Sequence, residues 1–318
     1  MSHRNSYVAR INRVIDHIDA HLDAPLDLQV LADVAHFSPW HFHRVFQAFT
    51  GETLAERVRR RRLEIAALRL LASPPETALA IALDVGLGSA EVFSRSFKNY
   101  FGVTPTAWRR GAHRDWVEAR RGELSKIHQA GRNSRQAVAD AFSDDGHDWQ
   151  SRQQVPIDEG ADMQLEIKTF PNVRVAYMRH LGPYGDAGIG RLWQRFGSWR
   201  RAEGLGGSET YGIAPDSPDI TSPEKCRYDA CVAIDDTFKP SGEVGIQTIA
   251  GGLYACQPFT GTTDDINGAW MRVYSQWLPE SGYQADDRPA VEAYGAEFKF
   301  DPKTGAFFCE LRLPVRAT

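Results

Sequence analysis

Apolar and polar residues alternate at helical spacing over the first part of the chain. Between residues 7 and 22, apolar side chains recur every three or four positions, which predicts an amphipathic first helix. The run LDLQVLADVA has the same spacing, and His36 and Phe37 follow it as a short connection. A second helix and a turn are therefore expected before residue 38. The buried stripe of the first helix would consist of Val8, Ile11, Ile15, Ile18 and Leu22.

One small unit then occurs twice. The stretch SPWHFHRVFQAFTGET, which starts at Ser38, is matched in register by SAEVFSRSFKNYFGVT, which starts at Ser89. Each serine stands where a helix N-cap is expected, and Pro39 takes a first helical position, where a missing amide proton has no cost. The repeat predicts two helix-turn-helix units in tandem. Their inward stripes would consist of Phe42, Val45 and Phe46 in the first copy and Phe93 and Phe97 in the second.

The outward face of each second helix remains available to a partner. In a helix-turn-helix, the N-terminal half of the second helix enters the DNA major groove. Arg44 and Arg95 stand at matching outward positions in the two copies. Trp40 lies on the same face, although a partly buried aromatic residue at a helix start is an equal alternative. The outward residues are Trp40, His43 and Arg44 in the first copy, and Ala90, Glu91, Ser94 and Arg95 in the second.

The tandem units, the connecting segment LAERVRRRRLEIAALRLL and the ending GLGSAEVFSRSFKNYFGVTPTAWRR resemble the DNA-binding domain of the AraC/XylS family of bacterial transcription regulators, over residues 7–110. The resemblance implies two recognition helices in successive major grooves, so that one chain binds an asymmetric site. Relatives often have amides where this chain has Ala90 and Glu91; Glu91 would accept from a cytosine amino group but would repel phosphates. The implied base-contacting residues are Trp40, His43, Arg44, Ala90, Glu91 and Arg95.

A second internal repeat lies beyond residue 160. Residues 173–206 and 252–284 each predict a strand, a turn containing glycine, and an amphipathic helix that bears two tryptophans. Two strand-like runs follow each helix and end in RYDACVAID and AFFCELRLPV. Two β-α-β-β units related by a pseudo-twofold axis would form one curved antiparallel sheet with two helices against it, and a cleft on the axis. The tryptophans are Trp193 and Trp199 in the first helix, and Trp270 and Trp277 in the second.

The motifs RHLGPY, GGLYA, WLPESGY, AVEAYG and CELRLPV, in this order, resemble the GyrI-like small-molecule-binding family over residues 163–316. The resemblance implies a cleft of aromatic residues with a carboxylate at its floor, suited to bulky cationic or amphipathic ligands. Stacked aromatic faces and a carboxylate would compensate such a cation for lost hydration. Glu310 fits the carboxylate position; its alternative is a surface ion pair with Arg312 on the same strand face. The candidate walls are Tyr184, Trp193, Tyr211, Trp270 and Tyr294.

Charge separates the two parts of the chain. Residues 1–112 contain fourteen Lys and Arg against eleven Asp and Glu, a net charge of +3, which leaves −7 for the rest because the total is −4. The run from Arg59 to Arg62 would contact DNA phosphates or form salt bridges with acidic neighbours. Between the two parts, the sequence is polar and has little periodicity. We expect a DNA-binding domain at 1–112, a polar linker at 113–160 and an effector-binding domain at 161–318.

No catalytic or cofactor-binding motif stands out. His17 and His21 have the spacing of metal ligands but no third ligand of matching spacing, so we expect no metal and place both on the solvent face of the first helix. The four cysteines lie in predicted strands without CxxC spacing, which indicates core thiols. No apolar stretch has membrane-spanning length, and the N-terminal region lacks the apolar segment of a signal peptide. A soluble cytoplasmic protein without membrane contact is expected. The cysteines are Cys226, Cys231, Cys256 and Cys309.

These features predict a multidomain protein, with an all-α tandem helix-turn-helix domain followed by an α+β domain of two β-α-β-β units. Its expected function is that of a ligand-responsive transcription regulator, not an enzyme. Its expected partners are a double-stranded DNA operator, a small-molecule effector and RNA polymerase. Two alternatives stay open for the second domain: a hydrolase of small electrophiles in which Glu310 and Tyr294 act as general base and acid, and a module that sequesters toxins or binds gyrase.

Overall fold

The computed structural model describes residues 3–72, 75–120, 165–184, 186–263, 265–296, 301 and 304–317. The chain divides into two compact units. The first comprises Met1–Gly122 together with Asp219–Thr221 and Ser241–Gly245, and the second comprises the remaining residues. The predicted boundary at residue 112 stays a prediction, and most of the predicted linker lies outside the described residues.

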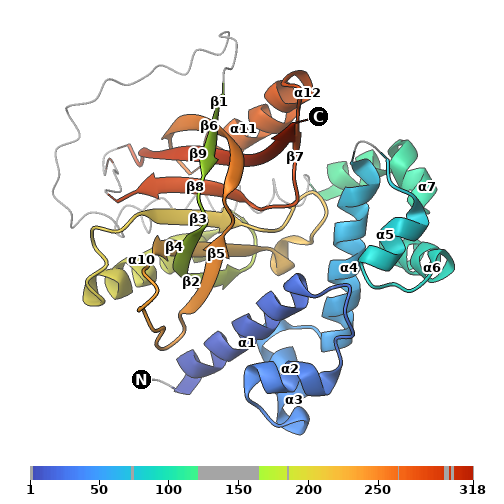
Figure 1. Cartoon of the computed structure of the whole chain (residues 1–318), viewed down its shortest axis with the longest axis horizontal. Coiled ribbons are helices and arrows are strands. Elements are labelled where there is room, and N and C mark those ends of the chain that lie inside the picture. Colours follow the sequence, from blue (N-terminus) through green and yellow to red (C-terminus); the bar gives the residue numbers. More distant parts are fainter. Residues whose placement is uncertain are drawn as a thin grey trace. The chain divides into compact units, whose positions relative to one another are not determined.

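The N-terminal segment of the first unit is helical and contains the two expected helix-turn-helix units (Figure 1). Helices α2 and α3 form the first, and α5 and α6 form the second, with α4 between them. The bounds are α1 His3–Ala20, α2 Leu28–Ala35, α3 Pro39–Thr50, α4 Leu54–Leu71, α5 Ala78–Asp84, α6 Ala90–Phe101 and α7 Pro105–Ala107, followed by the π-helical turn η1 Trp108–Ala112. The chain stays helical from residue 113 to residue 120.

Each recognition helix is fixed by its buried aromatic stripe. Phe42 and Phe46 of α3 are fully buried against α1 and α2, and Phe93 and Phe97 of α6 are fully buried in the second helical core. Ser89 caps α6 as expected, because its hydroxyl accepts from the Val92 amide at 3.2 Å. The other predicted cap differs: Ser38 occupies the N-cap position of α3, but its side chain makes no capping hydrogen bond.

Buried arginines of helix α4 form ion pairs within the helix and with residues outside it. Arg57, Arg60 and Arg61 are buried and form ion pairs of 2.8–3.2 Å with Glu52, Glu64 and Asp19. Arg62 donates to the backbone carbonyls of Leu22 and Ala24, at 2.9 and 3.0 Å. At Gly86 in the second turn, a Cβ would lie only 2.4 Å from the Leu22 carbonyl oxygen, and φ is +74°. A side chain is therefore excluded beside Arg62.

The second unit is a curved antiparallel sheet with helices against it, as expected. Its strands follow the order β1-β6-β9-β8-β3-β4-β2-β5, and β7 pairs with β9. The strand bounds are β1 Glu166–Phe170, β2 Val173–Leu181, β3 Thr210–Ala214, β4 Arg227–Ala233, β5 Gly245–Ile249, β6 Gly252–Gly261, β7 Tyr283–Ala285, β8 Ala290–Gly295 and β9 Phe307–Ala317. The helices are α10 Ala187–Ala202, η4 Pro223–Lys225, and α11 Asp265–Arg272, which η5 Val273–Trp277 and α12 Leu278–Glu280 continue.

The strand order shows the pseudo-twofold relation of the two halves. The half β2-α10-β3-β4 contributes neighbours β3-β4-β2, and the half β6-α11-β8-β9 contributes β8-β9-β6 in the mirrored order. The halves join where β3 pairs with β8, with Gly212 opposite Glu292. The edge strands are exchanged between the halves. Strand β1 precedes the first half in the chain but pairs with β6 of the second, and β5 precedes the second half but pairs with β2 of the first. Figure 1 shows the central strands β9, β8, β3 and β4 side by side.

The two faces of the sheet differ in what covers them. On one face, Trp193 of α10 contacts Tyr228 and Tyr294, and Trp270 of α11 reaches Glu292. The opposite face is filled by the sheet's own apolar side chains, including Tyr177, Tyr211, Cys231, Tyr254 and Cys256. One small pocket on this second face, with a volume of about 10 Å³, is lined by Tyr211 and Tyr254 among others. The four cysteines are buried thiols, as expected.

Candidate DNA-binding surface and ligand site

The first recognition helix presents two predicted base-contacting side chains to solvent. His43 and Arg44 of α3 are both exposed, while Phe42 between them and the turn is buried. The helix begins at Pro39, so both residues lie in its first half. The side chain of Trp40 lies outside the described residues, and its predicted role stays a prediction.

The second recognition helix repeats this arrangement with a different charge. Glu91 and Arg95 of α6 are exposed, and Ala90 is partly exposed. Hydrogen bonds from the Glu91 backbone amide and from Ser89 lower the pKa of the Glu91 carboxyl, so the group is ionised at neutral pH. An anion in the first turn interacts favourably with the helix N-terminus. Glu91 therefore has a local structural partner as well as an outward position.

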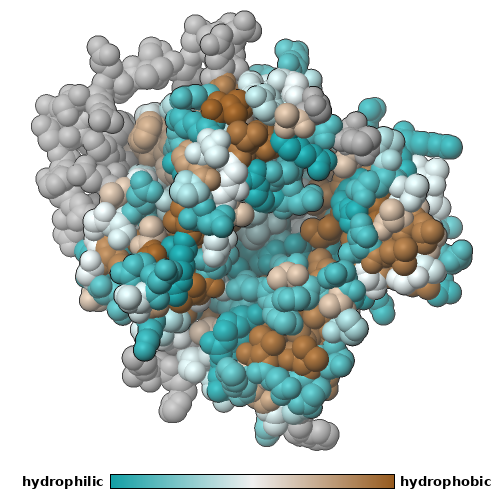
Figure 2. Space-filling view, viewed as in Figure 1, coloured by the Kyte–Doolittle hydropathy of each residue, from teal (hydrophilic) through white to brown (hydrophobic). Residues whose placement is uncertain are grey.

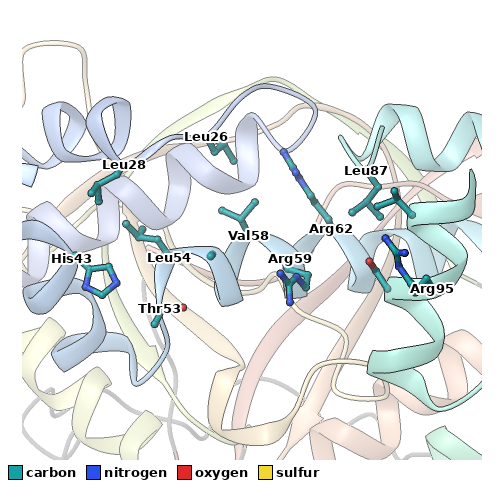
Figure 3. Close-up of a pocket in the computed structure, with 13 residues that line it drawn as sticks. Leu26, Leu28, His43, Thr53, Leu54, Val58, Arg59, Arg62, Leu87 and Arg95 are labelled. Carbon is teal, nitrogen blue, oxygen red and sulfur yellow. The ribbon is translucent and has the colours of Figure 1, made fainter. Parts of the chain in front are cut away.

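A groove of about 720 Å³ lies between the two recognition helices within the first unit (Figure 3). Residues of α3, α4 and α6 line it. Figure 3 shows His43 toward one end, Arg95 toward the other, and Arg59 of α4 between them. None of the 13 residues drawn is an aspartate or a glutamate. Two of the predicted DNA-contacting residues, His43 and Arg95, thus line one groove, and none of its lining residues carries a carboxylate.

In the second unit, a cluster of polar and aromatic side chains surrounds Glu292 on the helical face of the sheet. The hydroxyls of Tyr228 and Tyr294 each donate to Glu292 Oε2 at 2.8 Å, and Trp270 Nε1 donates to Oε1 at 3.3 Å. The ring of Trp193 lies 5.2 Å from that of Tyr294, edge to face. We call Tyr228, Trp193, Trp270, Glu292 and Tyr294 the Glu292 cluster. Its members come from both halves of the sheet and from both helices.

The Glu292 carboxylate lacks a cationic partner among the described residues. Burial raises the pKa of its carboxyl, while hydrogen bonds from Tyr294, Tyr228 and Trp270 act in the opposite direction and only reduce the shift. No arginine or lysine of the described chain contributes to this balance. The side chain is nevertheless partly exposed. The site can therefore hold a negative charge that a bound cation would neutralise.

Gly212 on β3 gives the cluster the space that it needs. A Cβ at this position would lie 2.0 Å from the Tyr228 hydroxyl and 2.8 Å from Glu292 Oε2. Because the Tyr228 ring is buried, such a group would displace the hydroxyl from the carboxylate. Gly212 was not among the residues expected to form the site.

The structure brings three of the six predicted ligand-binding residues together and separates the others. Trp193, Trp270 and Tyr294 belong to the Glu292 cluster. Glu310 pairs in register with Ala293, the neighbour of Glu292 in β8, so the two carboxylates point to opposite faces of the sheet. Tyr211 pairs with the same Ala293 and lies on the face of Glu310.

Glu310 and Tyr184 have partners of their own. Glu310 forms ion pairs of 2.8 Å with Lys168 and 2.7 Å with Arg312. Desolvation opposes ionisation of Glu310, but hydrogen bonds from Lys168 and Arg312 outweigh it and lower the pKa of this carboxyl. The hydroxyl of Tyr184 donates to the Asp216 carbonyl at 3.0 Å. The predicted pairing of Glu310 with Tyr294 as base and acid is not formed, since they lie on opposite faces.

The sequence contains a signal for the Glu292 position. Glu292 and Tyr294 stand two residues apart in AVEAYG, so strand alternation alone puts both on one face. The motif AVEAYG carries the resemblance to the GyrI-like family, and Glu292 is the carboxylate within it. Glu310 and Arg312 have the same spacing in CELRLPV, and there the alternation produces an ion pair instead.

Within the described ranges, no group of three or more His, Cys, Asp or Glu side chains is arranged to hold a metal ion. His17 and His21 stack at 4.2 Å, and His21 Nδ1 lies 2.8 Å from the His17 carbonyl. No helix in the described part of the chain is both long and apolar enough to cross a membrane.

Comparisons with known proteins match the two units separately. A helix-turn-helix domain model matches residues 31–111, and the GyrI-like small molecule binding domain model matches residues 163–316. Regulatory protein SoxS of Salmonella typhimurium is 38% identical over 99 residues, which are 31% of this chain and 92% of SoxS. Multiple antibiotic resistance protein MarA of Escherichia coli is 35% identical over 109 residues, or 34% of this chain and 85% of MarA. A DNA gyrase inhibitor of Edwardsiella piscicida is 32% identical over 158 residues, or 48% of this chain and 99% of that protein.

Proposed function

Because the chain belongs to the AraC family of DNA-binding regulators and carries a GyrI-like small-molecule-binding domain, we propose that it is a ligand-responsive transcription regulator. It binds an asymmetric double-stranded operator through α3 and α6, and it senses a bulky cationic or amphipathic molecule beside Glu292. The observation that carries the sensing role is the partly exposed Glu292 carboxylate, which has aromatic neighbours and no cationic partner within the described chain.

The exposed side chains of the two recognition helices support the operator-binding role. Arg44 and Arg95 each offer a planar guanidinium that can donate two hydrogen bonds to the O6 and N7 atoms of guanine. His43 adds a donor or acceptor in the first groove, and Glu91 an acceptor for a cytosine amino group in the second. Two different sets of side chains favour an asymmetric operator. Such a regulator acts where the chromosome is, and we place it in the cytoplasm.

The chemistry of the Glu292 cluster supports a cationic ligand. A delocalised cation that enters an aromatic site loses hydration, and the ring faces and the carboxylate compensate for this loss. Neutralisation of Glu292 would also remove the energetic penalty of its own desolvation. The walls that we propose are Trp193, Trp270 and Tyr294, with Tyr228 as a fourth. Ligand-binding roles for Glu310, Tyr184 and Tyr211 stay predictions, to be tested beside Glu292.

Contact with RNA polymerase would convert operator binding into a change in transcription. Leu79 and Leu83 of α5 are 50% and 52% exposed. Figure 2 shows apolar side chains gathered over the region of α5 and α6. Exposed apolar patches often mark protein interaction surfaces. We therefore propose this region as the contact for a protein partner of the transcription machinery.

Two alternatives for the second unit have their own support. Glu292 and Tyr294 are within hydrogen-bond distance, 2.8 Å, and a carboxylate with a raised pKa beside a tyrosine hydroxyl suits general base and acid chemistry. This geometry favours hydrolysis of a small electrophile as the second candidate function. The similarity to a DNA gyrase inhibitor supports a third role, in which the unit binds a protein.

Calorimetric titration of the full chain with a cation and a neutral isostere tests the sensing role. N-Methylquinolinium and 1-methylnaphthalene have nearly the same shape and differ in charge. We expect the wild type to prefer the cation, Glu292→Gln to lose most of that preference, and Glu310→Gln to retain it. Loss of the preference in Glu310→Gln alone would assign the role to Glu310. Turnover of a reactive ester by the wild type but not by Glu292→Gln would instead favour the hydrolase.

A further inference from the structure

One arginine of the connecting helix α4 differs from its neighbours, because it has no side-chain partner among the residues that the structure describes. Arg57, Arg60 and Arg61 are buried in ion pairs, and Arg62 is bonded to two backbone carbonyls. Arg59 is exposed, and within the described residues its guanidinium takes part in no hydrogen bond or ion pair. An unpaired guanidinium can bind a phosphate without first breaking an existing interaction.

Arg59 also occupies a particular place, because it lines the groove between the two recognition helices. Figure 3 shows it between His43 and Arg95. The groove contains three arginines and one histidine and no carboxylate among its lining residues. A concave surface with one sign of charge focuses the electrostatic potential and attracts the opposite charge. The apolar lining residues, such as Leu54 and Val58, further reduce solvation of whatever enters.

The geometry of B-DNA determines which part of the duplex faces this groove when both recognition helices are bound. Successive major grooves are separated by about 34 Å along the helix axis, and the segment between them presents a minor groove bordered by two phosphate strands. Helix α4 has 18 residues, which corresponds to a length of about 27 Å. A helix of this length that connects the two helix-turn-helix units faces the intervening segment for most of its length.

We propose that Arg59 binds phosphates of the DNA segment between the two major grooves, and so forms a third contact that positions the two recognition helices relative to each other. This inference rests on the operator-binding role proposed above. The contact is independent of base sequence, because phosphates are the same at every position. It fixes the spacing between the two half-sites.

The test uses the full chain and a duplex selected from a random library by the wild type, together with an unselected duplex. Arg59→Ala is compared with Arg13→Ala, which removes one exposed charge from α1 outside the groove. We expect Arg59→Ala to bind both duplexes about tenfold more weakly at low salt, and the slope of log K against log salt to decrease by about 0.9. Arg59→Lys should recover most of the affinity, since a phosphate accepts a point charge. Arg13→Ala should change neither quantity.

Neutral methylphosphonates at the central positions identify the atoms involved. On a duplex with these substitutions, the wild type and Arg59→Ala should bind equally. Unchanged affinity and slope for Arg59→Ala, with its thermal unfolding also unchanged, would overturn the proposal. A loss that depends on the central base sequence would overturn it in favour of base contacts in the minor groove. If the wild type selects no duplex at all, the operator-binding role itself fails; normal selection with an unaffected Arg59→Ala variant refutes only this contact.

Discussion

At the scale of single residues, Glu292 and Glu310 have opposite electrostatic roles although both are partly exposed strand glutamates. Burial raises the pKa of Glu292 in the folded chain, so its ionisation destabilises the fold. The protonated form of Glu292 therefore contributes stability, which is fully present below the ordinary glutamate pKa and is lost as pH rises through the raised pKa. The pKa of Glu310 is lowered through Lys168 and Arg312, so its contribution is present above the ordinary pKa and is lost as pH falls through the lowered one.

The two glutamine variants should therefore shift the melting temperature in opposite directions at pH 7. We expect Glu292→Gln to raise it and Glu310→Gln to lower it, and both differences should shrink in acid. Differential scanning calorimetry of the ligand-free chain from pH 4 to pH 8 measures both. A lower melting temperature for Glu292→Gln throughout this range would show that its hydrogen bonds outweigh its desolvation.

Arg44 is the residue whose removal should affect operator binding most clearly. It is exposed in the first half of α3, and within the described chain its guanidinium takes part in no hydrogen bond or ion pair. Arg44→Ala should weaken binding to a selected operator by about 1–3 kcal/mol and relax base preference at one position. Competition binding with single-base operator variants measures both effects. A uniform loss at all sequences would instead show a phosphate contact.

Glu91 should oppose DNA binding in general while it contributes to specificity. Its carboxylate is ionised at the start of α6 and fully exposed. Glu91→Gln removes the repulsion of phosphates, so we expect tighter binding to unselected DNA and a weaker preference for cytosine at one operator position. Electrophoretic mobility shifts on both kinds of duplex measure this. Weaker binding to every duplex would indicate that the charge mainly stabilises the helix start.

Residue-scale prediction from sequence succeeded where a local pattern determines orientation. The exposed positions of His43, Arg44 and Arg95 follow from the buried phenylalanines of each helix, which stand four residues apart and so define its inward stripe. The predicted ligand residues lie on both faces of the sheet. The family resemblance identified each of them separately, whereas strand alternation decides which face each one occupies. The role of Gly212 could not be predicted, because its close approach to Tyr228 depends on pairing across strands.

At the scale of elements, the helices were predictable because each carries its own apolar stripe and start signal. The helical residues 113–120 are an extension that the predicted boundary at 112 cuts off. Trp116 there lies 4.9 Å from the ring of Phe101 and 6.2 Å from that of Trp108. We expect a fragment that ends at Gly122 to have a free energy of unfolding about 1–3 kcal/mol higher than one that ends at Gly111. This is below the roughly 3–5 kcal/mol typical of a fully buried aromatic residue, because Trp116 is only partly buried. Urea unfolding of both measures the difference, and equal midpoints would contradict it.

The sheet was predictable only within each β-α-β-β half. Strands β1 and β5 were not expected, and each pairs with the half that does not contain it. Local patterns of hydrophobicity define a strand and its buried face but not its partner, since pairing is decided by contacts distant in sequence. The two halves form one sheet through the pairing of β3 with β8. The Glu292 cluster depends on this union, because Tyr228 comes from β4 and Glu292 from β8.

At the scale of the whole molecule, a regulator must couple its two binding events. If effector binding changes the affinity for the operator by some factor, operator binding must change the affinity for the effector by the same factor, because the four states form a closed thermodynamic cycle. This reciprocity holds whether transcription rises or falls, and it requires no particular contact between the two units. It therefore tests the regulatory role without knowledge of the direction of the response.

We expect a coupling factor of about 5–150, typical of allosteric proteins. N-Methylquinolinium is titrated into the full chain with and without saturating operator, and operator is titrated with and without the saturating cation. Glu292→Gln should reduce the effect of the cation on operator affinity, because it weakens ligand binding, while its own operator affinity without ligand stays that of the wild type. Arg44→Ala provides the matched control: it weakens operator binding but should leave the cation's affinity for the DNA-free chain unchanged. A coupling factor of one in both titrations would contradict regulation through operator affinity and would assign the effector's action to a step after DNA binding.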